Sequence, residues 1–475
     1  MMNQNHNRMP IFERLQQFTY KDPISFHVPG HKNGEIFPKH ARSYFDSILK
    51  LDMTELHGLD DLHAPTEMIA EAEGLAADFF GSDHTFFLVG GSTAGNLAMV
   101  LAACSPGGKI IVQRNCHKSV MNGLELSGAK PVFIAPNYDE AVDRYTSPSL
   151  STLEEALQKH SDAKAIVLTY PDYFGRTYPI KAMIDLAHSY NIPVLVDEAH
   201  GVHFALGKPF PASALRLGAD AVVQSAHKMA PAMTMASYLH IKSKLISKER
   251  IAHYLQIIQS SSPSYPLMAS LDIARFFLAK LESNDIERIL RSVNEVRTIL
   301  DKCEAWNVLP IEVQDDPLKI TLHVKQSYSV QDVARLFEEE NLYPELTTHN
   351  QLLLIHGLEP FNKQTQLQKI VKRVGEQLKI ELNHDTIEIA KLFPEAIQEL
   401  ALSYQEMQAR SYRRVPFGEG IEHIAAEAVI AYPPGIPIIL KGERITTAHL
   451  ATTRQLRNQG VRIQQRESGI KIYRK

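Results

Sequence analysis

The sequence predicts an α/β protein whose central sheet is mostly parallel. Between about residue 66 and residue 245, short apolar runs alternate with amphipathic segments of helical period, which is the pattern of strands joined by crossover helices. The chain of 475 residues is too long for one ordinary core, so we expect several domains. The expected strands lie near residues 85–89, 109–113, 130–135, 165–170, 193–197, 221–226 and 237–241.

Changes of pattern along the chain divide it into four expected regions. These are an N-terminal arm (1–65), a large α/β domain (66–305), a small α/β lobe (306–390) and a C-terminal α+β domain (391–475). Long helical patterns from Ser247 to Leu300 end the large domain. In the small lobe, strand and helix patterns alternate at residues 318–322, 330–340, 352–355 and 363–378. In the C-terminal domain we expect helices over 394–410 and 446–458 and two short terminal strands.

The composition indicates a globular protein that handles small molecules. Apolar residues make up 44% of the chain, charged residues make up 22%, and the net charge is −4. This balance provides no general attraction for nucleic acid or anionic lipid, so we expect neither as a partner. The uncharged stretch Thr85–Gly108 is long enough for a membrane span, but Gly90 and Gly91 break it into a strand and a helix.

The cysteines and the N-terminus predict a cytoplasmic protein. Cys104, Cys116 and Cys303 are odd in number and far apart, which favours a reducing compartment over a disulfide framework. Residues 1–10 are polar and contain no apolar core of a signal peptide, so we expect no export.

Two charged residues at the ends of expected strands suggest a pyridoxal phosphate site. Asp197 ends the apolar run 192–196, and Lys228 follows the run 221–226. Ligands of open α/β sheets bind at the carboxyl ends of the strands, where both residues would lie. The cofactor requires a lysine for its Schiff base and a carboxylate that keeps its pyridine nitrogen protonated. Taken singly, Asp197 is better explained as a hydrogen-bonded loop carboxylate and Lys228 as a surface lysine; together they favour the cofactor site.

Further polar residues occur just after expected strands. Ser92 and Thr93 follow Gly90 and Gly91 at the start of an expected helix. Their hydroxyls and the backbone N–H groups of the helix N-terminus together predict a binding site for the cofactor phosphate. The alternative is an ordinary helix cap, for which serine and threonine are preferred. His117 follows the strand near residues 109–113. Its ring is suited to stack on a cofactor, and the alternative is a histidine that starts a helix.

Two rival interpretations of the same residues fail. Residues 197–200 spell the helicase box Asp-Glu-Ala-His, but a helicase also needs a P-loop. The nearest candidate, residues 105–110, lacks the first glycine and has isoleucine at the hydroxyl position. His200 and His203 suggest a metal, as do His27 and His31, but no third ligand lies at a useful spacing. We therefore expect no metal site.

With these residues established, the chain resembles the ornithine/lysine/arginine decarboxylase family of fold-type-I pyridoxal phosphate enzymes over most of its length. It resembles the compact Bacillus-type members, because it starts almost at the first family marker and lacks the N-terminal wing domain of the large members. The markers, in order, are Phe26-His27-Val28-Pro29-Gly30-His31-Lys32, Leu59-Asp60-Asp61-Leu62-His63-Ala64-Pro65, the Ser92-Thr93 turn, Arg114-Asn115-Cys116-His117-Lys118-Ser119, Asp197-Glu198-Ala199-His200-Gly201, Ser225-Ala226-His227-Lys228, Ser261-Ser262-Pro263-Ser264-Tyr265 and Tyr432-Pro433-Pro434-Gly435-Ile436-Pro437.

The resemblance implies a fold-type-I transferase-like large domain and a role for each site residue. Lys228 would form the Schiff base, Asp197 would pair with the pyridine nitrogen, and His117 would stack on the ring. Ser262 lies in a segment resembling a loop that reaches the neighbouring subunit's phosphate, so a homodimer or a higher even oligomer is expected. The remaining implied cofactor contacts, most of them to the phosphate, are Ser92, Thr93, His200, Ser225 and His227.

The activity implied by the resemblance is a lyase reaction on a basic amino acid. Arginine, lysine or ornithine would lose its carboxylate as CO₂ and leave a polyamine-type amine. An aminotransferase or another lyase on the same fold is one alternative, because the fold does not determine which bond at Cα is cleaved. A catalytically weak regulatory protein that binds the cofactor is the other.

Three segments depart from the pattern of the family. Relatives usually have Asn-Pro-Thr-Tyr where this chain has Tyr170-Pro171-Asp172-Tyr173. They usually have Gly-Arg in the block that here reads Gly418-Glu419-Gly420-Ile421-Glu422-His423-Ile424, and Pro-Gly-Glu in place of Lys441-Gly442-Glu443. The departures bear on which substrate is bound. Asp172 and Glu198 are the candidate partners for a distal cation of the substrate.

Overall fold

The structure is a computed structural model that describes residues 5–380, 393, 395–431, 436–458, 463 and 469–474. The chain forms two compact units. The first joins Met1–Ala103 to Ala187–Leu281, and the second joins Cys104–Leu186 to Glu282–Lys475. The marker at Tyr432–Gly435 and the second expected terminal strand lie largely outside the described residues.

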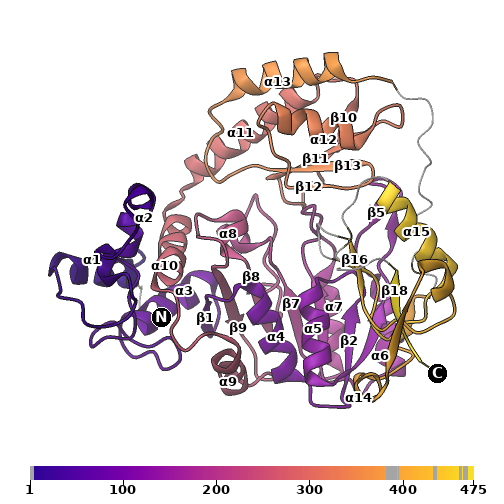
Figure 1. The fold of residues 1–475 in the computed structure, drawn as a ribbon, viewed down its shortest axis with the longest axis horizontal. Helices are drawn as coiled ribbons and strands as arrows, with labels where there is room; N and C mark the ends of the chain where they lie inside the picture. The colour runs from indigo at the N-terminus through magenta and orange to yellow at the C-terminus, as the bar shows by residue number, and fades with distance from the viewer. Residues whose placement is uncertain are drawn as a thin grey trace. The chain divides into compact units, whose positions relative to one another are not determined.

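The first unit is built on four strands in the order β1, β9, β8, β7. Strands β7 and β8 are parallel, whereas β9 is antiparallel to both β8 and β1. Its strands are β1 (His84–Leu88), β7 (Val194–Asp197), β8 (Ala221–Gln224) and β9 (Ser237–Ile241). Its helices, followed in Figure 1, are α1 (Pro10–Tyr20), α2 (Arg42–Leu49), α3 (Met68–Phe80), α4 (Gly91–Ala103), α8 (Ala226–Met229), α9 (Lys248–Ile258) and α10 (Tyr265–Lys280).

The second unit contains a second group of four sheet strands, in the order β6, β2, β3, β14. Strand β2 is parallel to β3 and β6, and β14 is antiparallel to β3. The strands are β2 (Lys109–Gln113), β3 (Lys130–Ile134), β6 (Ile166–Thr169) and β14 (Ile397–Glu399), with a small hairpin of β4 (Tyr138–Asp139) and β5 (Arg144–Tyr145). The helices are α5 (Lys118–Ser127), α6 (Leu150–Lys159) and α7 (Ile180–Ser189), the last of which continues into the first unit.

The small lobe and the C-terminal segment complete the second unit. The lobe has a four-stranded antiparallel sheet of β10 (Trp306–Val308), β11 (Lys319–Val324), β12 (Leu346–Thr347) and β13 (Gln351–Ile355), with helices α11 (Ser283–Leu300), α12 (Val330–Glu339) and α13 (Gln364–Gln377). The C-terminal segment contains α14 (Tyr404–Ala409), β15 (Tyr412–Val415), β16 (Val429–Ala431), β17 (Ile436–Ile439), α15 (Thr447–Asn458) and β18 (Ile470–Tyr473).

Local sequence signals explain where many of these helices begin and end. Ser149, Ser247 and Ser264 precede α6, α9 and α10, and each side chain accepts a hydrogen bond from a backbone N–H of the first turn. Helices α3 and α5 end at Gly81 and Gly128, which adopt the left-handed conformation that glycine tolerates best.

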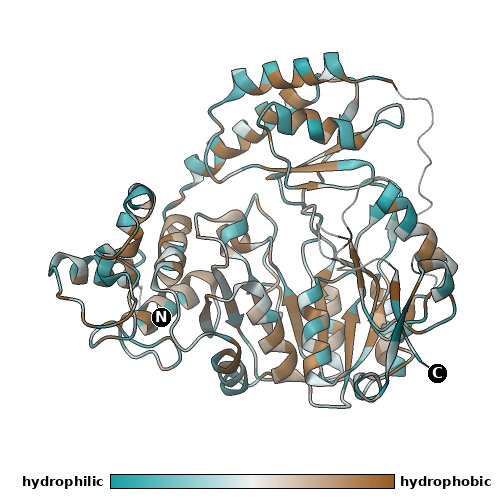
Figure 2. Cartoon of the chain, in the orientation of Figure 1, coloured by the Kyte–Doolittle hydropathy of each residue, from teal (hydrophilic) through white to brown (hydrophobic). Residues whose placement is uncertain are grey.

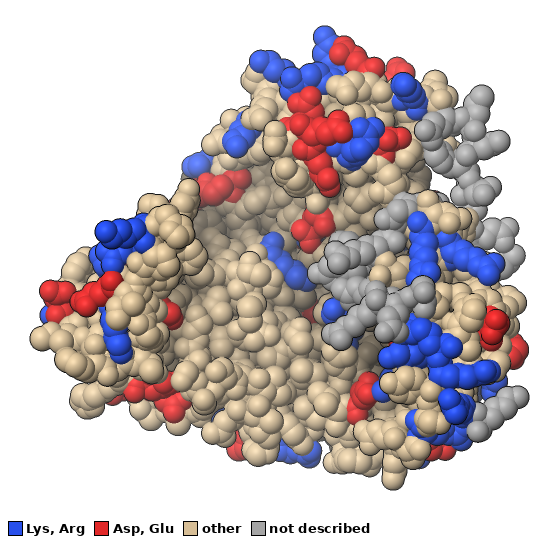
Figure 3. Space-filling view, in the orientation of Figure 1, with Lys and Arg blue, Asp and Glu red and all other residues tan. Residues whose placement is uncertain are grey.

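The small lobe shows the helical pattern of buried and exposed faces. Helix α13 buries Leu367, Ile370, Val371 and Val374, and Figure 2 shows its outer surface hydrophilic. Figure 3 shows acidic and basic side chains interspersed over the region of α12 and α13. On α12, Arg335 forms ion pairs with Asp332 and Glu339. Within the described part of the chain, every helix is too short or too polar to cross a membrane.

The strands expected from the sequence are confirmed, with ends that differ by at most two residues. One expectation is wrong: residues 394–410 do not form one helix. Residues 397–399 instead form β14 on the edge of β3, and only 404–409 are helical. Residues 397–399 form a strand despite their helical pattern, because the edge of β3 offers unpaired backbone groups that a strand can satisfy.

A buried ion pair on α10 holds the N-terminal segment. The Asp272 carboxylate accepts hydrogen bonds from Ile11 N at 2.9 Å and from Arg275 Nη2 at 2.8 Å. Arg275 also donates to the backbone oxygens of His6 and Arg8. Both charged side chains have 0% exposure. The arginine thus neutralises a buried acid and satisfies backbone carbonyls that precede α1.

We expect Arg275→Met to destabilise the first unit strongly. The substitution leaves Asp272 buried without its cation, at a cost of about 3–5 kcal/mol. Thermal unfolding should show a large drop in Tm, and proteases should cleave before residue 20 more readily. The control is Arg288→Met, whose side chain is 55% exposed in an ion pair with Asp285 and contributes about 1 kcal/mol or less. Equal stability of the two variants would contradict this role for Arg275.

Candidate functional site

The structure brings the acid and the lysine of the first unit to the same edge of its strands. Asp197 is the last residue of β7, and Lys228 lies in α8, directly after β8. Asp197 is only 3% exposed. Its Oδ2 accepts a hydrogen bond from Asn96 Nδ2 at 2.9 Å, and Oδ1 accepts one from Ala199 N at 3.2 Å. A buried carboxylate is therefore held by donors and oriented at the strand end.

Lys228 has a histidine as neighbour. Its Nζ lies 3.1 Å from His200 Nε2, and the His200 side chain is buried. His200 follows Asp197 by three residues, so the turn after β7 supplies both a carboxylate and an imidazole. The arrangement provides an amine together with a group able to exchange a proton with it.

Hydroxyl groups converge at the N-terminus of α4. Ser92 Oγ is hydrogen-bonded to Ser225 Oγ and lies 3.3 Å from Ser237 Oγ. Thr93 is exposed on the same helical turn. The helix begins at Gly91, whose φ is positive. Hydroxyls beside helical N–H groups suit a phosphate. His227 Nδ1 lies 3.2 Å from Ala236 O, so the structure gives it a contact to backbone.

Three residues of this site were missed by the sequence analysis. Asn96 holds Asp197, Ser237 adds a hydroxyl, and Gln259 Oε1 accepts hydrogen bonds from Val89 N and Gly90 N at 2.8 and 3.3 Å. The spacing of Ser92 and Asn96 could have revealed Asn96, because residues i and i+4 share a helix face. No local signal identifies Ser237 or Gln259.

The segment that contains Ser262 is anchored through its neighbours. His63 Nε2 lies 2.9 Å from Ser260 O, and Tyr265 OH donates to Asp60 O at 2.7 Å. Ser262 itself is exposed. Two family markers are thus joined, with Ser262 presented on the surface of the first unit.

In the second unit, His117 is the N-cap of α5. Its Nδ1 accepts a hydrogen bond from Ser119 N at 3.2 Å and lies 2.8 Å from Ser119 Oγ. The helix-start interpretation is therefore confirmed. It is compatible with a second role, since the cap uses one ring nitrogen and leaves the ring faces for other contacts.

The two acids considered for a distal substrate cation both have structural contacts. Glu198 has 0% exposure, and its oxygens accept from Ala214 N and Gln224 Nε2. Burial raises its pKa from 4.5 to about 8. In the second unit, Asp172 Oδ1 accepts from Phe174 N and Arg176 N at 2.9 and 2.8 Å.

A cation from β5 also contacts the Asp172 loop. Asp172 Oδ2 lies 3.6 Å from Arg144 Nε, and the Arg144 guanidinium lies 4.1 Å from the Phe174 ring centroid. These contacts give Asp172 a role in ordering the loop that follows Tyr170. The other departure leaves Glu419 and Glu422 exposed on the surface.

The histidines once considered as metal ligands have other contacts. His203 packs against Phe204 and Phe210, and His31 Nε2 lies 3.2 Å from Asp52 Oδ2. Among the described residues, no group of three or more potential ligands is arranged for a metal ion.

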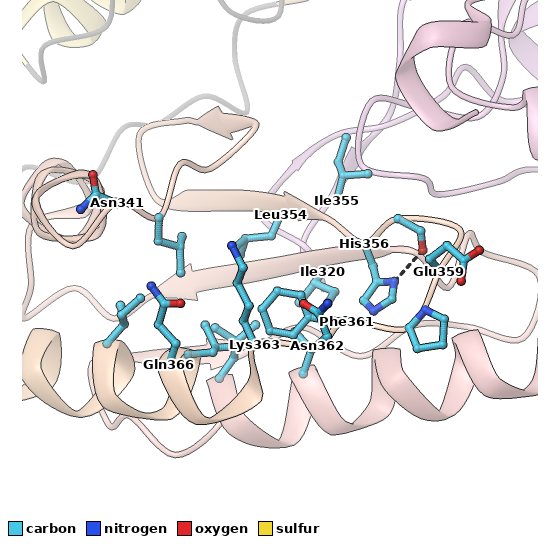
Figure 4. A pocket seen from close by; sticks show the side chains of 17 residues that line it. Ile320, Asn341, Leu354, Ile355, His356, Glu359, Phe361, Asn362, Lys363 and Gln366 are labelled. Atoms are coloured by element: carbon cyan, nitrogen blue, oxygen red, sulfur yellow. Dashed lines mark hydrogen bonds between the residues drawn. The ribbon is translucent and has the colours of Figure 1, made fainter. Parts of the chain in front are cut away.

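A pocket of about 480 Å³ lies in the small lobe. Its walls include apolar residues of α11, β11, β13 and α13, and Figure 4 shows Lys363 and Gln366 among its polar residues. His356 Nδ1 donates a hydrogen bond to Gly357 O at 2.7 Å, and His356 Nε2 lies 3.1 Å from Ser292 Oγ. No residue assigned to the cofactor lines this pocket.

Comparisons with known proteins agree with this geometry. A family model described as Orn/Lys/Arg decarboxylase, major domain, matches residues 9–328, and one described as the C-terminal domain of the same family matches residues 383–464. The uncharacterized protein YaaO from Bacillus subtilis (strain 168) is 45% identical over 444 residues, covering 92% of both chains. Arginine decarboxylase from the same organism is 35% identical over 459 residues, covering 94% of this chain and 93% of the relative.

A solved structure shows the same fold. The crystal structure of the Francisella novicida lysine decarboxylase LdcF has a TM-score of 0.82 at 20% identity and covers 98% of this chain and 81% of that chain. The expectation of a fold-type-I pyridoxal phosphate enzyme fold is confirmed.

We expect Glu198→Gln to affect stability and not substrate binding. Both oxygens of Glu198 accept hydrogen bonds from N–H donors. In the glutamine variant the side-chain NH₂ group faces one of these donors, which then has no acceptor, at a cost to the free energy of unfolding of about 1–3 kcal/mol. Glu198 has a folded pKa of about 8 against 4.5 when exposed, so its contribution to stability is complete below about pH 4.5 and is lost as pH rises through about 8. The Tm of the variant should therefore fall less between pH 5 and pH 8 than that of the wild type.

The control for this prediction is Glu154→Gln, because Glu154 is exposed on α6. It should leave both Tm and its pH dependence unchanged. An unchanged Tm for Glu198→Gln, together with a KM raised about tenfold or more (about 1.4 kcal/mol), would instead show that Glu198 binds the substrate.

Proposed function

Because this chain belongs to the Orn/Lys/Arg decarboxylase family, we propose that it decarboxylates arginine to the corresponding amine with pyridoxal phosphate as cofactor. One observation carries the choice of arginine: the 35% identity to a Bacillus subtilis arginine decarboxylase extends over nearly the whole chain, against 20% to the lysine decarboxylase with the same fold. Lysine and ornithine are the other basic substrates to test.

The side chains of the first unit fit this cofactor. They comprise an amine on Lys228, a buried carboxylate on Asp197 that Asn96 hydrogen-bonds, and three serine hydroxyls at the N-terminus of α4. These are the groups that an aldehyde, a pyridine nitrogen and a phosphate require. When bound, the cofactor withdraws the electrons left at Cα after CO₂ departs. A serine palmitoyltransferase with this fold has been solved with the cofactor, which agrees with the proposal.

Each residue then has a defined task. Asp197 would hold the proton on the pyridine nitrogen, and the Asn96 amide keeps the carboxylate oriented. Ser92, Thr93, Ser225 and His227 hold the phosphate, and Ser237 adds a hydroxyl. Lys228 would hold the aldehyde group of the cofactor.

Proton transfer at Cα is the last task. Lys228 and His200 are within hydrogen-bond distance of each other, so either nitrogen can deliver the proton that replaces CO₂, and the other can restore it. His117, the cap of α5, would stack on the cofactor ring.

We also propose a cytoplasmic location. All three cysteines are buried and none forms a disulfide, which agrees with a reducing compartment.

We expect Lys228→Ala to abolish the visible absorption of the purified protein and to lower CO₂ release from arginine by at least about 10²-fold, since both attachment and proton transfer are lost. Lys244→Ala, an exposed lysine on the same unit, should behave as the wild type. The measurements are an absorbance spectrum and CO₂ detection with arginine, lysine and ornithine in turn.

Other outcomes of this experiment identify the alternatives. A keto acid without CO₂ would indicate an aminotransferase, and a cofactor that stays bound without turnover of any amino acid would indicate a regulatory protein. A protein that cannot be loaded with pyridoxal phosphate would overturn the proposal altogether.

We further propose that two copies of this chain form a dimer through the N-terminal arm. Large apolar side chains of this arm are exposed in the single chain, including Ile24 at 85%, Phe26 at 94% and Tyr44 at 87%. Exposed apolar groups so close together in sequence mark an interaction surface. The exposed Ser262 is then available to the phosphate site of the second copy.

We expect light scattering to report a dimer and Phe26→Asp to shift it toward monomer, because the new charge would be buried at the interface. Cofactor retention should fall with it, since Ser262 would no longer reach the partner. The matched control is Val313→Asp, an equally exposed apolar residue at 99% on a loop of the small lobe. A dimer that Phe26→Asp leaves intact would place the interface elsewhere.

A further inference from the structure

The loop that leads from β2 into α5 is held by a turn of the C-terminal segment. The loop runs from Arg114 to His117, and α5 begins with Lys118. The turn consists of Lys441, Gly442 and Glu443, which follow β17. All of these residues belong to the second unit. One ion pair connects the turn with the loop, and a second connects the turn with α5.

Arg114 makes the first of the two connections. Its side chain is 1% exposed, and its Nη2 donates to Glu443 Oε2 at 3.0 Å. The same guanidinium donates to Pro437 O at 2.8 Å and to Ile438 O at 3.1 Å. Three acceptors from one short segment thus fix the position of the Arg114 side chain. Arg114 lies three residues before His117. The planar guanidinium of arginine has several N–H donors in fixed directions, so it can bind all three acceptors, whereas the single ammonium group of lysine cannot.

Glu443 is held in place by groups other than Arg114. Its Oε1 accepts a hydrogen bond from Gln398 Nε2 at 2.9 Å, and its Oε2 accepts one from Leu440 N at 2.6 Å. The carboxylate is 2% exposed. Because these two donors do not depend on Arg114, they hold the Glu443 carboxylate in one orientation in which it accepts from the guanidinium.

Lys441 makes the second connection, at the other end of α5. Its Nζ is hydrogen-bonded to Glu125 Oε1, and both side chains are partly exposed. The turn itself needs Gly442, whose φ is +87° and whose added Cβ would lie 1.8 Å from Met407 Cε.

We propose that the Lys441–Glu443 turn positions His117 by holding the Arg114 loop, so that the C-terminal segment controls the affinity for the cofactor. The inference rests on the proposed function, because it assumes that His117 stacks on the cofactor ring. Arg114 and Glu443 are positioning residues in this scheme, and neither touches the cofactor. Displacement of a stacking group by a fraction of an ångström weakens its contact, since packed interactions decline steeply with distance.

The central experiment is a double-mutant cycle between Glu443→Gln and His117→Ala. Glu443→Gln keeps the shape of the side chain and removes the charge that holds Arg114. In the wild-type background it should raise the Kd of the apoenzyme for pyridoxal phosphate about tenfold, which corresponds to about 1.4 kcal/mol, and shift the absorption maximum of the loaded protein. In the His117→Ala background the same substitution should change Kd less than about twofold, because the two residues act as one unit.

Two controls separate positioning from general stability. Glu427→Gln removes another ion pair of the C-terminal segment, with Arg414 at 3.0 Å, and should leave the Kd for the cofactor unchanged. Lys441→Ala breaks only the partly exposed pair, so it folds even if Glu443→Gln does not. It should raise Kd about two- to fivefold, as expected for a pair worth up to about 1 kcal/mol.

Additive effects of Glu443→Gln and His117→Ala would overturn the inference, even if Tm falls. An unchanged Kd in both Glu443→Gln and Lys441→Ala would do the same. Failure of the wild-type protein to bind pyridoxal phosphate would be a different result, since it would remove the proposed function itself.

Discussion

The close approach of α4 to the strands beneath it is the constraint on which the candidate site depends. A Cβ added to Gly95 would lie 2.7 Å from Val223 Cγ2 and 2.8 Å from Leu88 Cδ1, distances that no real side chain tolerates. Only glycine lets the helix lie this near to β1 and β8. As a result, Ser92 and Asn96 of α4 reach Ser225 and Asp197. One helix therefore carries both Ser92, which contacts the hydroxyl of Ser225, and Asn96, which contacts the buried acid Asp197.

The buried charges of this protein fall into two kinds. Asp272 and Glu443 each have an arginine partner and backbone donors, and both join segments that are distant in sequence. Asp197 is different, because its hydrogen-bond partners among the described contacts are neutral groups. A buried carboxylate satisfied by neutral donors is suited to receive a cation, and the protonated pyridine nitrogen of the cofactor is that cation in the proposed reaction.

A further consequence concerns substrate choice. Glu198 and Asp172 are the acids nearest in sequence to the expected site, yet contacts within the protein account for both of them. Specificity for the distal group of a basic amino acid therefore has to come from other residues. The dimer that we propose would supply such residues from the second copy of the chain, since Ser262 is exposed.

The sequence by itself determined the order of strands and helices, the α/β class, and the positions of Asp197 and Lys228 at the ends of β7 and β8, because alternating apolar runs and residues at strand ends depend on local periodicity. The exposed helix caps also followed from local residue types. Tertiary structure alone decided that residues 397–399 pair with β3, that Asn96 and Gln259 support the site, and that Glu443 binds Arg114. These contacts join residues more than 100 positions apart, and a hydrogen bond at that separation leaves no periodic signal in the sequence.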